Sequence, residues 1–268
     1  MKYFVYSLFG ILILLTFSYI LTRFILRKNK TKTNMRIIIF LIIFTLSYTI
    51  SSLAYLLPYY KADDVALTYL HDEDTLKYID EDKYYGFINE SSDTAVIFVP
   101  GSKVDSYAYS SLMKGIALNN VDVYVIKPLF YFPLFSVKEI EKMVESINYE
   151  NIFMGGHSLG GYISSKCLYD KNVKGIFLLG AYPNENIRKD ISLLSIYGDS
   201  DGILEKDKYE KFKEYWPIDS TEFVIKGANH SGYGYYELQK GDNEATINTD
   251  DQIAITIKEI NTFIDAHR

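Results

Sequence analysis

Apolar residues along the 268-residue chain form two long blocks, which are followed by many short runs. The blocks cover residues 3–26 and 37–57, and Arg23 is the only charged residue in either. A helix needs roughly 20 mostly apolar residues to cross a bilayer, so each block is long enough. A cleaved secretory leader has a shorter apolar run and a small-residue cleavage site. The pattern therefore predicts two transmembrane helices that form a hairpin membrane anchor over residues 1–57.

The segment between the two blocks predicts how the chain is oriented. Residues 27–36, RKNKTKTNMR, contain five basic residues and no acidic residue. Short loops rich in Lys and Arg stay on the cytoplasmic side of a membrane. We therefore expect a multi-pass protein of the cell membrane, with both termini outside and everything after about Pro58 extracytoplasmic.

After the blocks, short apolar runs alternate with amphipathic segments. Residues 58–84 are polar and acidic and predict a linker with one or two leading antiparallel strands, and residues 85–268 predict a single domain. The runs predict strands at residues 95–100, 121–126, 151–154, 175–180, 193–198 and 222–227. The segments between them predict helices at residues 107–120, 136–149, 157–170 and 204–216. Apolar strands separated by helices indicate an α/β fold, in which a mostly parallel sheet carries helices on both faces.

Composition excludes several classes of function. The net charge is −6, whereas binding to nucleic acid requires clustered Lys and Arg. The one cysteine, Cys167, cannot form an intramolecular disulfide and is expected to pack as a small apolar residue on a helix. Zinc-binding motifs are absent, and the glycine-rich segments match neither the dinucleotide nor the phosphate-loop spacing. We therefore expect no metal and no organic cofactor.

In parallel sheets, sites form beyond the carboxyl ends of the strands. Four segments lie there: PGSKVD at 100–105, GGHSLGG at 155–161, GDSDG at 198–202 and GANHSGYG at 227–234. In the second, Gly156, Ser158 and Gly160 satisfy G-x-S-x-G between a strand and a helix, where the serine of a strained turn acts as a nucleophile. The N–H of Leu159 is then placed to stabilise an oxyanion. An ordinary helix-starting turn is the alternative.

A serine nucleophile needs a general base and an acid that orients it. Among the four histidines, His71 and His267 are expected on the surface, and His157 adjoins the serine but points away from it. His230, after the last strand, is therefore the predicted base. For the acid we favour Asp201 over Asp199, because the intervening turn residues let Asp201 reach back towards the histidine, while Asp199 braces the turn.

The order Ser158, Asp201, His230 is that of the α/β-hydrolase triad. With VPGSKVD, GGHSLGG, GDSD and NHSGYGYY in sequence, residues 85–265 resemble the α/β-hydrolase superfamily and are most similar to the group called alpha/beta hydrolase fold-5, which is related to dienelactone hydrolases. The resemblance supports Asp201 as the acid and implies that the N–H of Ser102 or Lys103 is the second oxyanion donor. Tyr233 replaces a usual Phe, and Tyr236-Glu237 replaces a Tyr-Gly pair, so the histidine loop departs from the family's pattern at these positions.

These features predict a membrane-anchored serine hydrolase, specifically a carboxylesterase that cleaves a small or acyl ester through an acyl-enzyme. Two alternatives remain open: cleavage of a thioester, lactone or amide by the same triad, and a non-catalytic envelope protein that binds through the hydrolase fold. The expected partners are the small-molecule or acyl-ester substrate and the lipid bilayer. The apolar segment LFYFPLFSV at 129–137 either lines an acyl pocket, touches the bilayer or packs on the core.

Overall fold

The computed structural model describes residues 2–27, 32–73, 75–168 and 172–268, with side chains described from residue 10 onward. The chain forms two compact units, Met1–Pro58 and Tyr59–Arg268. Residues 59–84 therefore belong to the second unit.

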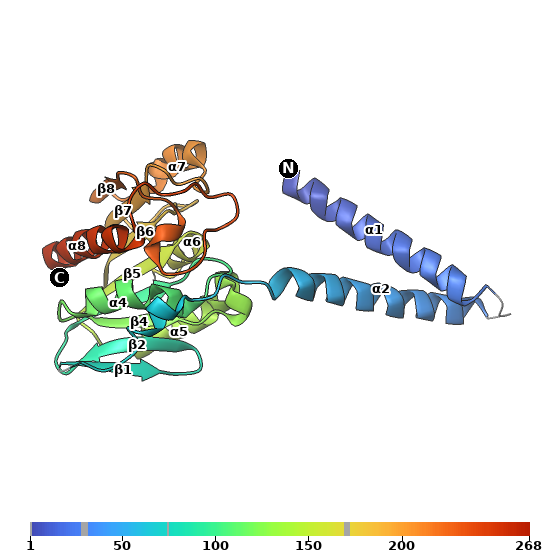
Figure 1. The fold of residues 1–268 in the computed structure, drawn as a ribbon, viewed down its shortest axis with the longest axis horizontal. Helices are drawn as coiled ribbons and strands as arrows, with labels where there is room; N and C mark the ends of the chain where they lie inside the picture. Colours follow the sequence, from blue (N-terminus) through green and yellow to red (C-terminus); the bar gives the residue numbers. More distant parts are fainter. Residues whose placement is uncertain (1, 28–31, 74, 169–171) are drawn as a thin grey trace. The chain divides into compact units, whose positions relative to one another are not determined.

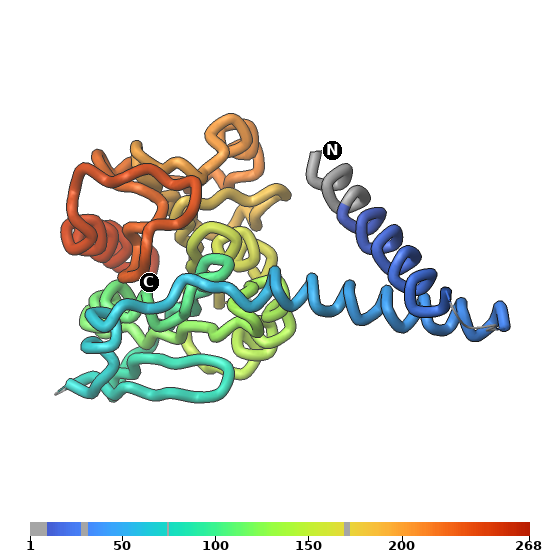
Figure 2. The backbone as a smooth tube through the Cα atoms, turned by 45° about the vertical axis from the view of Figure 1, so that its right-hand side comes forward, coloured from blue at the N-terminus to red at the C-terminus, as the bar shows by residue number. Residues whose placement is uncertain are grey.

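The first unit consists of two helices, α1 (Lys2–Ile25) and α2 (Thr33–Leu56), which run in opposite directions and contact each other (Figure 2). Ser18 of α1 is fully buried, with its Oγ 3.4 Å from Ser47 Oγ of α2. Of the predicted basic loop, residues 28–31 lie outside the described part of the chain. Among the described residues, α2 is the one helix long and apolar enough to span a membrane, and the apolar part of α1, Gly10–Ile25, is shorter.

The second unit is built on an eight-stranded sheet with the order β1-β2-β4-β3-β5-β6-β7-β8 (Figure 1). Strand β2 is antiparallel to both β1 and β4, and every other neighbouring pair is parallel, so the sheet is mostly parallel as predicted. The strands are β1 (Leu76–Asp80), β2 (Tyr84–Asn89), β3 (Thr94–Val99), β4 (Asp122–Ile126), β5 (Asn151–His157), β6 (Val173–Leu179), β7 (Ser192–Gly198) and β8 (Ser220–Ile225).

Helices cover both faces of this sheet and bury two apolar layers. The helices are α3 (Asp64–Leu67), α4 (Ser110–Ala117), α5 (Val137–Ser146), α6 (Leu159–Ser164), α7 (Lys206–Phe212) and α8 (Thr249–His267), with short 3-10 turns η1 (Ser106–Tyr109), η2 (Leu129–Tyr131), η3 (Pro133–Ser136), η4 (Lys213–Tyr215) and η5 (Ser231–Tyr233).

Side chains alternate between the two layers along each central strand. In β3, Val96 and Phe98 pack with α4 and α8, whereas Ile97 and Val99 pack with α5 and α6. This alternation follows from the period of two in a strand, and it explains why the central strands read as continuous apolar runs.

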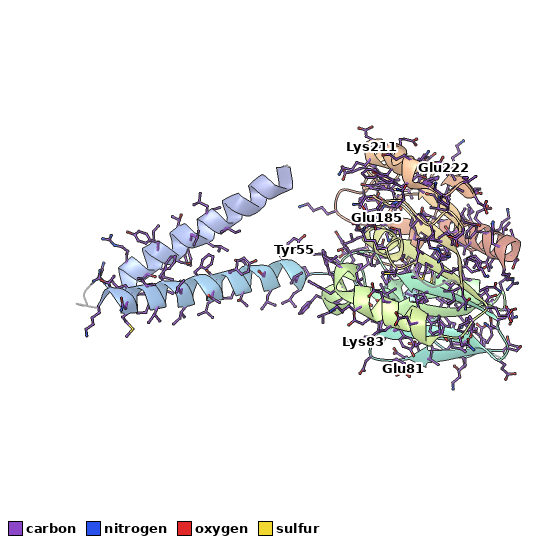
Figure 3. The ribbon with its side chains drawn as sticks, turned by 180° about the vertical axis from the view of Figure 1, so that it is seen from behind. Tyr55, Glu81, Lys83, Glu185, Lys211 and Glu222 are labelled. Carbon is purple, nitrogen blue, oxygen red and sulfur yellow. The ribbon has the colours of Figure 1, made fainter. Side chains whose placement is uncertain are left out.

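Smaller contacts hold the sheet edge near β8. Lys213 pairs with Glu210 of α7 and Glu222 of β8, each at 2.9 Å. Figure 3 labels Glu222 on β8 and Lys211 on α7 at this edge. These pairs are partly exposed, so each contributes little to stability.

Three helix predictions need correction. In the described part of the predicted helix 157–170, the helix covers only Leu159–Ser164, and residues 169 and 170 lie outside the described residues. Cys167 is buried beyond the end of this helix rather than on it. The hydroxyl of Ser165 bonds to Tyr162 O, three residues earlier, and such local bonds compete with helix continuation. The predicted helices 107–120 and 204–216 each divide into a 3-10 turn and a shorter α-helix.

Helix α8 was not predicted from the hydrophobic pattern. Its signals are present: Asn248 caps the helix by accepting from Asp251 N at 2.7 Å, and Ile253, Ile260 and Ile264 form a buried stripe at helical spacing.

Candidate active site

Ser158 occupies a strained turn between β5 and α6. Its backbone has φ 53° and ψ −124°, a conformation that residues with a side chain rarely adopt. The turn is held because Ser158 N–H donates to Leu179 O on the neighbouring strand β6 at 2.9 Å. Strain of this kind costs of order 1–3 kcal/mol and persists only where the surroundings impose it. The half-buried serine is thereby lifted out of the end of the sheet.

The glycines of the motif are required by the closeness of neighbouring backbone. A Cβ on Gly160 would lie 2.2 Å from the carbonyl oxygens of both Val99 and Pro100, and one on Gly156 would lie 2.5 Å from Gly160 C. Any larger residue would push the serine turn away from the end of β3. The G-x-S-x-G spacing therefore fixes the serine turn against the Pro100 turn.

His230 and Asp201 form a buried pair. His230 Nδ1 lies 2.7 Å from Asp201 Oδ2, and both side chains are almost completely buried. Asp201 Oδ1 also accepts from Ile203 N at 2.8 Å and from Leu204 N at 2.7 Å. Because the carboxylate is an acceptor only, Nδ1 carries the proton and Nε2 is left as an acceptor.

The second ring nitrogen of His230, Nε2, does not take part in the contacts with Asp201. It is buried and has no hydrogen-bond partner among the described residues, so the structure does not join it to Ser158. Both residues line the same pocket. Catalytic hydrogen bonds are often unformed in a free enzyme and form when substrate binds. The arrangement thus brings Ser158, His230 and Asp201 to one rim of the sheet, with the serine contact not yet made.

Asp199 is placed differently from Asp201. It is exposed, and its Oδ1 accepts from Gly227 N at 2.7 Å, which ties the turn after β7 to the turn after β8. Its carboxylate therefore braces the two loops, while Asp201 contacts the imidazole.

His157 is buried and packs beside His230, with ring centroids 4.5 Å apart. Its Nδ1 is hydrogen-bonded to the hydroxyl of Tyr109 at 2.7 Å, and that hydroxyl accepts from Gly101 N at 3.1 Å. Burial, with a smaller effect from neighbouring His230, holds the pKa of His157 well below its ordinary value, so the ring is neutral. Tyr109 therefore connects the Pro100 turn to the serine turn, and sequence reasoning missed this role.

Of the two alternatives for the second oxyanion donor, the structure uses one elsewhere. Lys103 N–H donates to Tyr131 O at 2.6 Å, and Lys103 has φ 62°. For Ser102 N–H, no acceptor is recorded in the described part of the chain. Neither Ser102 nor Lys103 is among the described residues that line the pocket, whereas Leu159 is.

The pocket beside Ser158 has a volume of about 470 Å³. Its wall is mainly apolar and aromatic, and its polar rim includes a Glu205–Lys208 ion pair with an N–O distance of 2.6 Å. Its lining residues are Ser158, Leu159, Tyr162, Gly180, Ala181, Tyr182, Asn184, Ile203, Leu204, Glu205, Lys208, Phe212 and His230. Segment 129–137 contributes no residue to this described lining, so its interpretation as an acyl-pocket wall is wrong.

Two further residues position the acid and histidine loops and were missed as site residues. Asp242 accepts from Gly202 N at 3.0 Å and from Ser231 N at 2.8 Å, and so links the two loops. Gln252 of α8 bonds to both the N–H and the C=O of Asn229, at 3.2 and 2.9 Å. Their only sequence signal was their place in the segment after the histidine, because neither contact is local.

Comparison with known proteins agrees with this architecture. A search of curated proteins returned no match. Among solved structures, the chain is similar to a soluble variant of monoglyceride lipase from Saccharomyces cerevisiae (15% identity, 72% of this chain and 95% of that chain, TM-score 0.54). It is also similar to a ferulic acid esterase from Streptomyces cinnamoneus (14% identity, 66% and 68%, TM-score 0.54) and to a structure described as a predicted CIB-like hydrolase from Thermoplasma acidophilum (14% identity, 70% and 97%, TM-score 0.53). At these identities the likeness shows the fold alone.

The sequence match is more direct. The profile of the "Alpha/beta hydrolase family" matches residues 95–254, which is more than half of the chain and runs from β3 into α8. The chain belongs to the alpha/beta hydrolase family.

Proposed function

We propose that this protein is a serine hydrolase that cleaves carboxylic esters through an acyl-enzyme. One observation carries the proposal: His230, which pairs with the buried Asp201 and has an unpartnered buried Nε2, lines the same pocket as the strained Ser158. An unpaired buried acceptor costs roughly 1–3 kcal/mol of stability, so its retention needs a reason. A role for Nε2 as the acceptor of the Ser158 hydroxyl proton would explain why this atom is kept without a partner.

In the proposed reaction, Ser158 Oγ attacks the ester carbonyl carbon while His230 Nε2 takes the hydroxyl proton. The same proton then passes to the alkoxide leaving group, and the acyl group remains on Ser158. Water, deprotonated by Nε2, attacks the acyl carbon, and the bond between that carbon and Ser158 Oγ breaks, which releases the acid. The proton on Nε2 passes to Oγ and restores the serine. Asp201 holds Nδ1–H throughout and stabilises the imidazolium that forms.

The negative charge that develops on the carbonyl oxygen needs two donors. Leu159 N–H, at the start of α6, is the first donor in the proposal. We assign the second to Ser102 rather than Lys103, because Lys103 N–H is already bonded to Tyr131 O at 2.6 Å. The two turns touch where Gly160 meets Val99 O and Pro100 O, which supports donors from both.

The substrate in this proposal is an ester of modest size with an apolar acyl group. The apolar wall formed by Tyr162, Tyr182 and Phe212 favours such a group, and the charged Glu205–Lys208 rim favours a polar portion at the mouth. A panel of p-nitrophenyl esters of graded chain length, with matched thioester, lactone and amide substrates, determines the bond and the chain length. If the thioester, the lactone or the amide were turned over faster than the matched ester, the protein would be assigned to that bond class instead of to the carboxylesterases.

A fluorophosphonate probe tests the catalytic proposal directly. Wild-type protein should be labelled covalently, and Ser158→Ala should not be labelled. Ser91→Ala, at an exposed serine on the loop before β3, is the matched control and should label like wild type. Equal labelling of wild type and Ser158→Ala, or none of either, would overturn the proposal.

The apolar hairpin completes the proposal as a membrane anchor. Helix α2 has span length and no buried residue, and α1 contacts it. The basic residues between the helices favour a cytoplasmic turn, which places the hydrolase unit outside. Protease added to intact cells should digest the hydrolase unit. Full protection would instead place that unit in the cytoplasm.

A further inference from the structure

The segment Leu129–Phe135, between β4 and α5, exposes an apolar patch that the proposed reaction does not use. Four of its side chains are solvent-exposed: Leu129 (57%), Phe130 (37%), Leu134 (55%) and Phe135 (47%). No charged residue occurs between Lys127 and Lys138. Apolar patches this concentrated on a soluble face indicate an interaction surface rather than ordinary surface variation.

The backbone of this segment holds the patch outwards at a cost. Phe130 and Tyr131 have φ of 54° and 56°, so two successive bulky residues adopt the left-handed conformation. That conformation costs roughly 1–2 kcal/mol per residue. Pro133 and Ser136 are buried and secure the segment from below. A segment that only had to cover the core could relax by turning these aromatic rings inwards.

The chain itself indicates what covers the patch. Tyr131 stacks on Tyr59 with ring centroids 3.7 Å apart, so Tyr59 is part of the patch. Tyr59 follows Leu56, the last residue of α2, by only three residues, a reach of about 10 Å. If α2 leaves a bilayer at Leu56, Tyr59 is thus held within about 10 Å of that surface, and its stacking on Tyr131 joins it to the segment that carries the rest of the patch. Tyrosines are also the residues enriched at the membrane interface.

The patch is also close to the reaction site. Turn η3 packs against α6, and Leu159 and Tyr162 of α6 line the pocket together with Ser158. The patch and the pocket therefore adjoin the same short helix, whose diameter with side chains is roughly 10–12 Å. A lipid surface in contact with the patch would thus lie near the pocket.

We propose that the patch formed by Tyr59, Leu129, Phe130, Leu134 and Phe135 inserts into the outer face of the lipid bilayer and positions the pocket to receive acyl esters from the membrane. This inference rests on the proposed membrane anchor and on the proposed hydrolase site. It adds a second, non-spanning membrane contact, in which apolar side chains enter the interfacial layer by about 5–10 Å.

Depth-dependent fluorescence quenching tests the contact on the full-length chain in vesicles. Trp216, the only tryptophan, is first removed by Trp216→Phe. In this background a single tryptophan is introduced by Leu134→Trp, Ile218→Trp or Leu46→Trp. Ile218 is the matched control, because it is an apolar side chain with 95% exposure outside the patch. Leu46 of α2 reports on the anchor.

Phospholipids brominated on the acyl chain should quench the Leu134→Trp emission at least about twofold more than the Ile218→Trp emission, given the interfacial depth expected. Equal quenching at the two positions would overturn the inference. If Leu134→Trp were then also shielded from acrylamide, the patch would be covered by a protein partner or a second copy of the chain instead of by lipid. Quenching of Leu46→Trp without quenching of Leu134→Trp would leave the anchor standing and remove only the patch contact. Absence of quenching at Leu46 would instead remove the anchor and, with it, the basis of this inference.

A kinetic readout separates this contact from the catalytic proposal. The double variant Leu134→Glu, Phe135→Glu should hydrolyse an ester embedded in vesicles about tenfold more slowly than wild type, since two apolar side chains no longer enter the bilayer. Its rate on a soluble short-chain ester should be unchanged, and Ile218→Glu should behave as wild type on both. An equal loss on both substrates, or no loss on either, would contradict the inference.

Discussion

Replacement of Asp201 by Asn tests how the imidazole is held. Asn has the size of Asp, but only one of its two terminal atoms accepts hydrogen bonds. If its oxygen keeps the bonds from Ile203 N and Leu204 N, at 2.8 and 2.7 Å, its NH2 group faces His230 Nδ1. Nδ1 must then be the acceptor and Nε2 must carry the proton. In that tautomer Nε2 cannot take the proton of Ser158.

The expected loss is large in rate and small in stability. A wrong imidazole tautomer lowers kcat by about 10³–10⁴-fold, which corresponds to roughly 4–5.5 kcal/mol in the activation barrier. The fold should persist, because both backbone bonds to residue 201 are kept. The assay is kcat for a short p-nitrophenyl ester, with thermal unfolding measured on the same samples.

Asp199→Asn is the matched control. It removes the same charge two residues away, where the carboxylate is exposed and accepts from Gly227 N at 2.7 Å. We expect less than about a tenfold loss in kcat, because the amide oxygen can keep this bond and no reacting group is contacted. If Asp201→Asn keeps more than a tenth of the wild-type kcat, or if Asp199→Asn costs as much, the orienting acid has been assigned to the wrong residue.

Three further predictions follow from other contacts. Tyr109→Phe removes the hydroxyl that joins Gly101 N–H to His157 Nδ1. Its free energy of unfolding in urea should therefore fall by roughly 1–3 kcal/mol, and its kcat should be lower than that of wild type. An unchanged kcat would show that the Pro100 turn is positioned without Tyr109. Gly160→Ala should lower kcat by about a hundredfold, because a Cβ 2.2 Å from Val99 O and Pro100 O must displace the serine turn. The control is Gly241→Ala, where a Cβ would have no atom within 4 Å; despite the φ of 98° at this position, it should retain the wild-type kcat. Similar kcat values for the two variants would refute the steric argument. Cys167 is fully buried, and burial raises the pKa of its thiol to about 12, so the thiol stays protonated at pH 8 and should react with Ellman's reagent only after unfolding in urea; rapid reaction of the native protein would contradict this.

The parts of the fold that depend on local pattern were predictable. Continuous apolar runs such as the one at residues 95–100 can be buried only in a sheet covered on both faces, so they indicated the α/β architecture. G-x-S-x-G also carries its own geometry, since the glycines and the strained serine are neighbours in the chain. Helix α8 lies outside the predicted elements, although its cap and its apolar stripe are local signals.

The sequence alone determined which residue types could serve: one serine on a glycine-flanked turn, one histidine after the last strand and two aspartates two residues apart. The turn and the family resemblance already favoured Asp201 over Asp199, and the fold adds that Asp201 is the carboxylate in contact with the imidazole, whereas Asp199 contacts Gly227 N. The fold also pairs Lys103 N–H with Tyr131 O, and it places Tyr109 between the Pro100 turn and the serine turn. These contacts join residues far apart in the chain, and their partners are set by how the loops pack at the sheet edge, which no local pattern encodes.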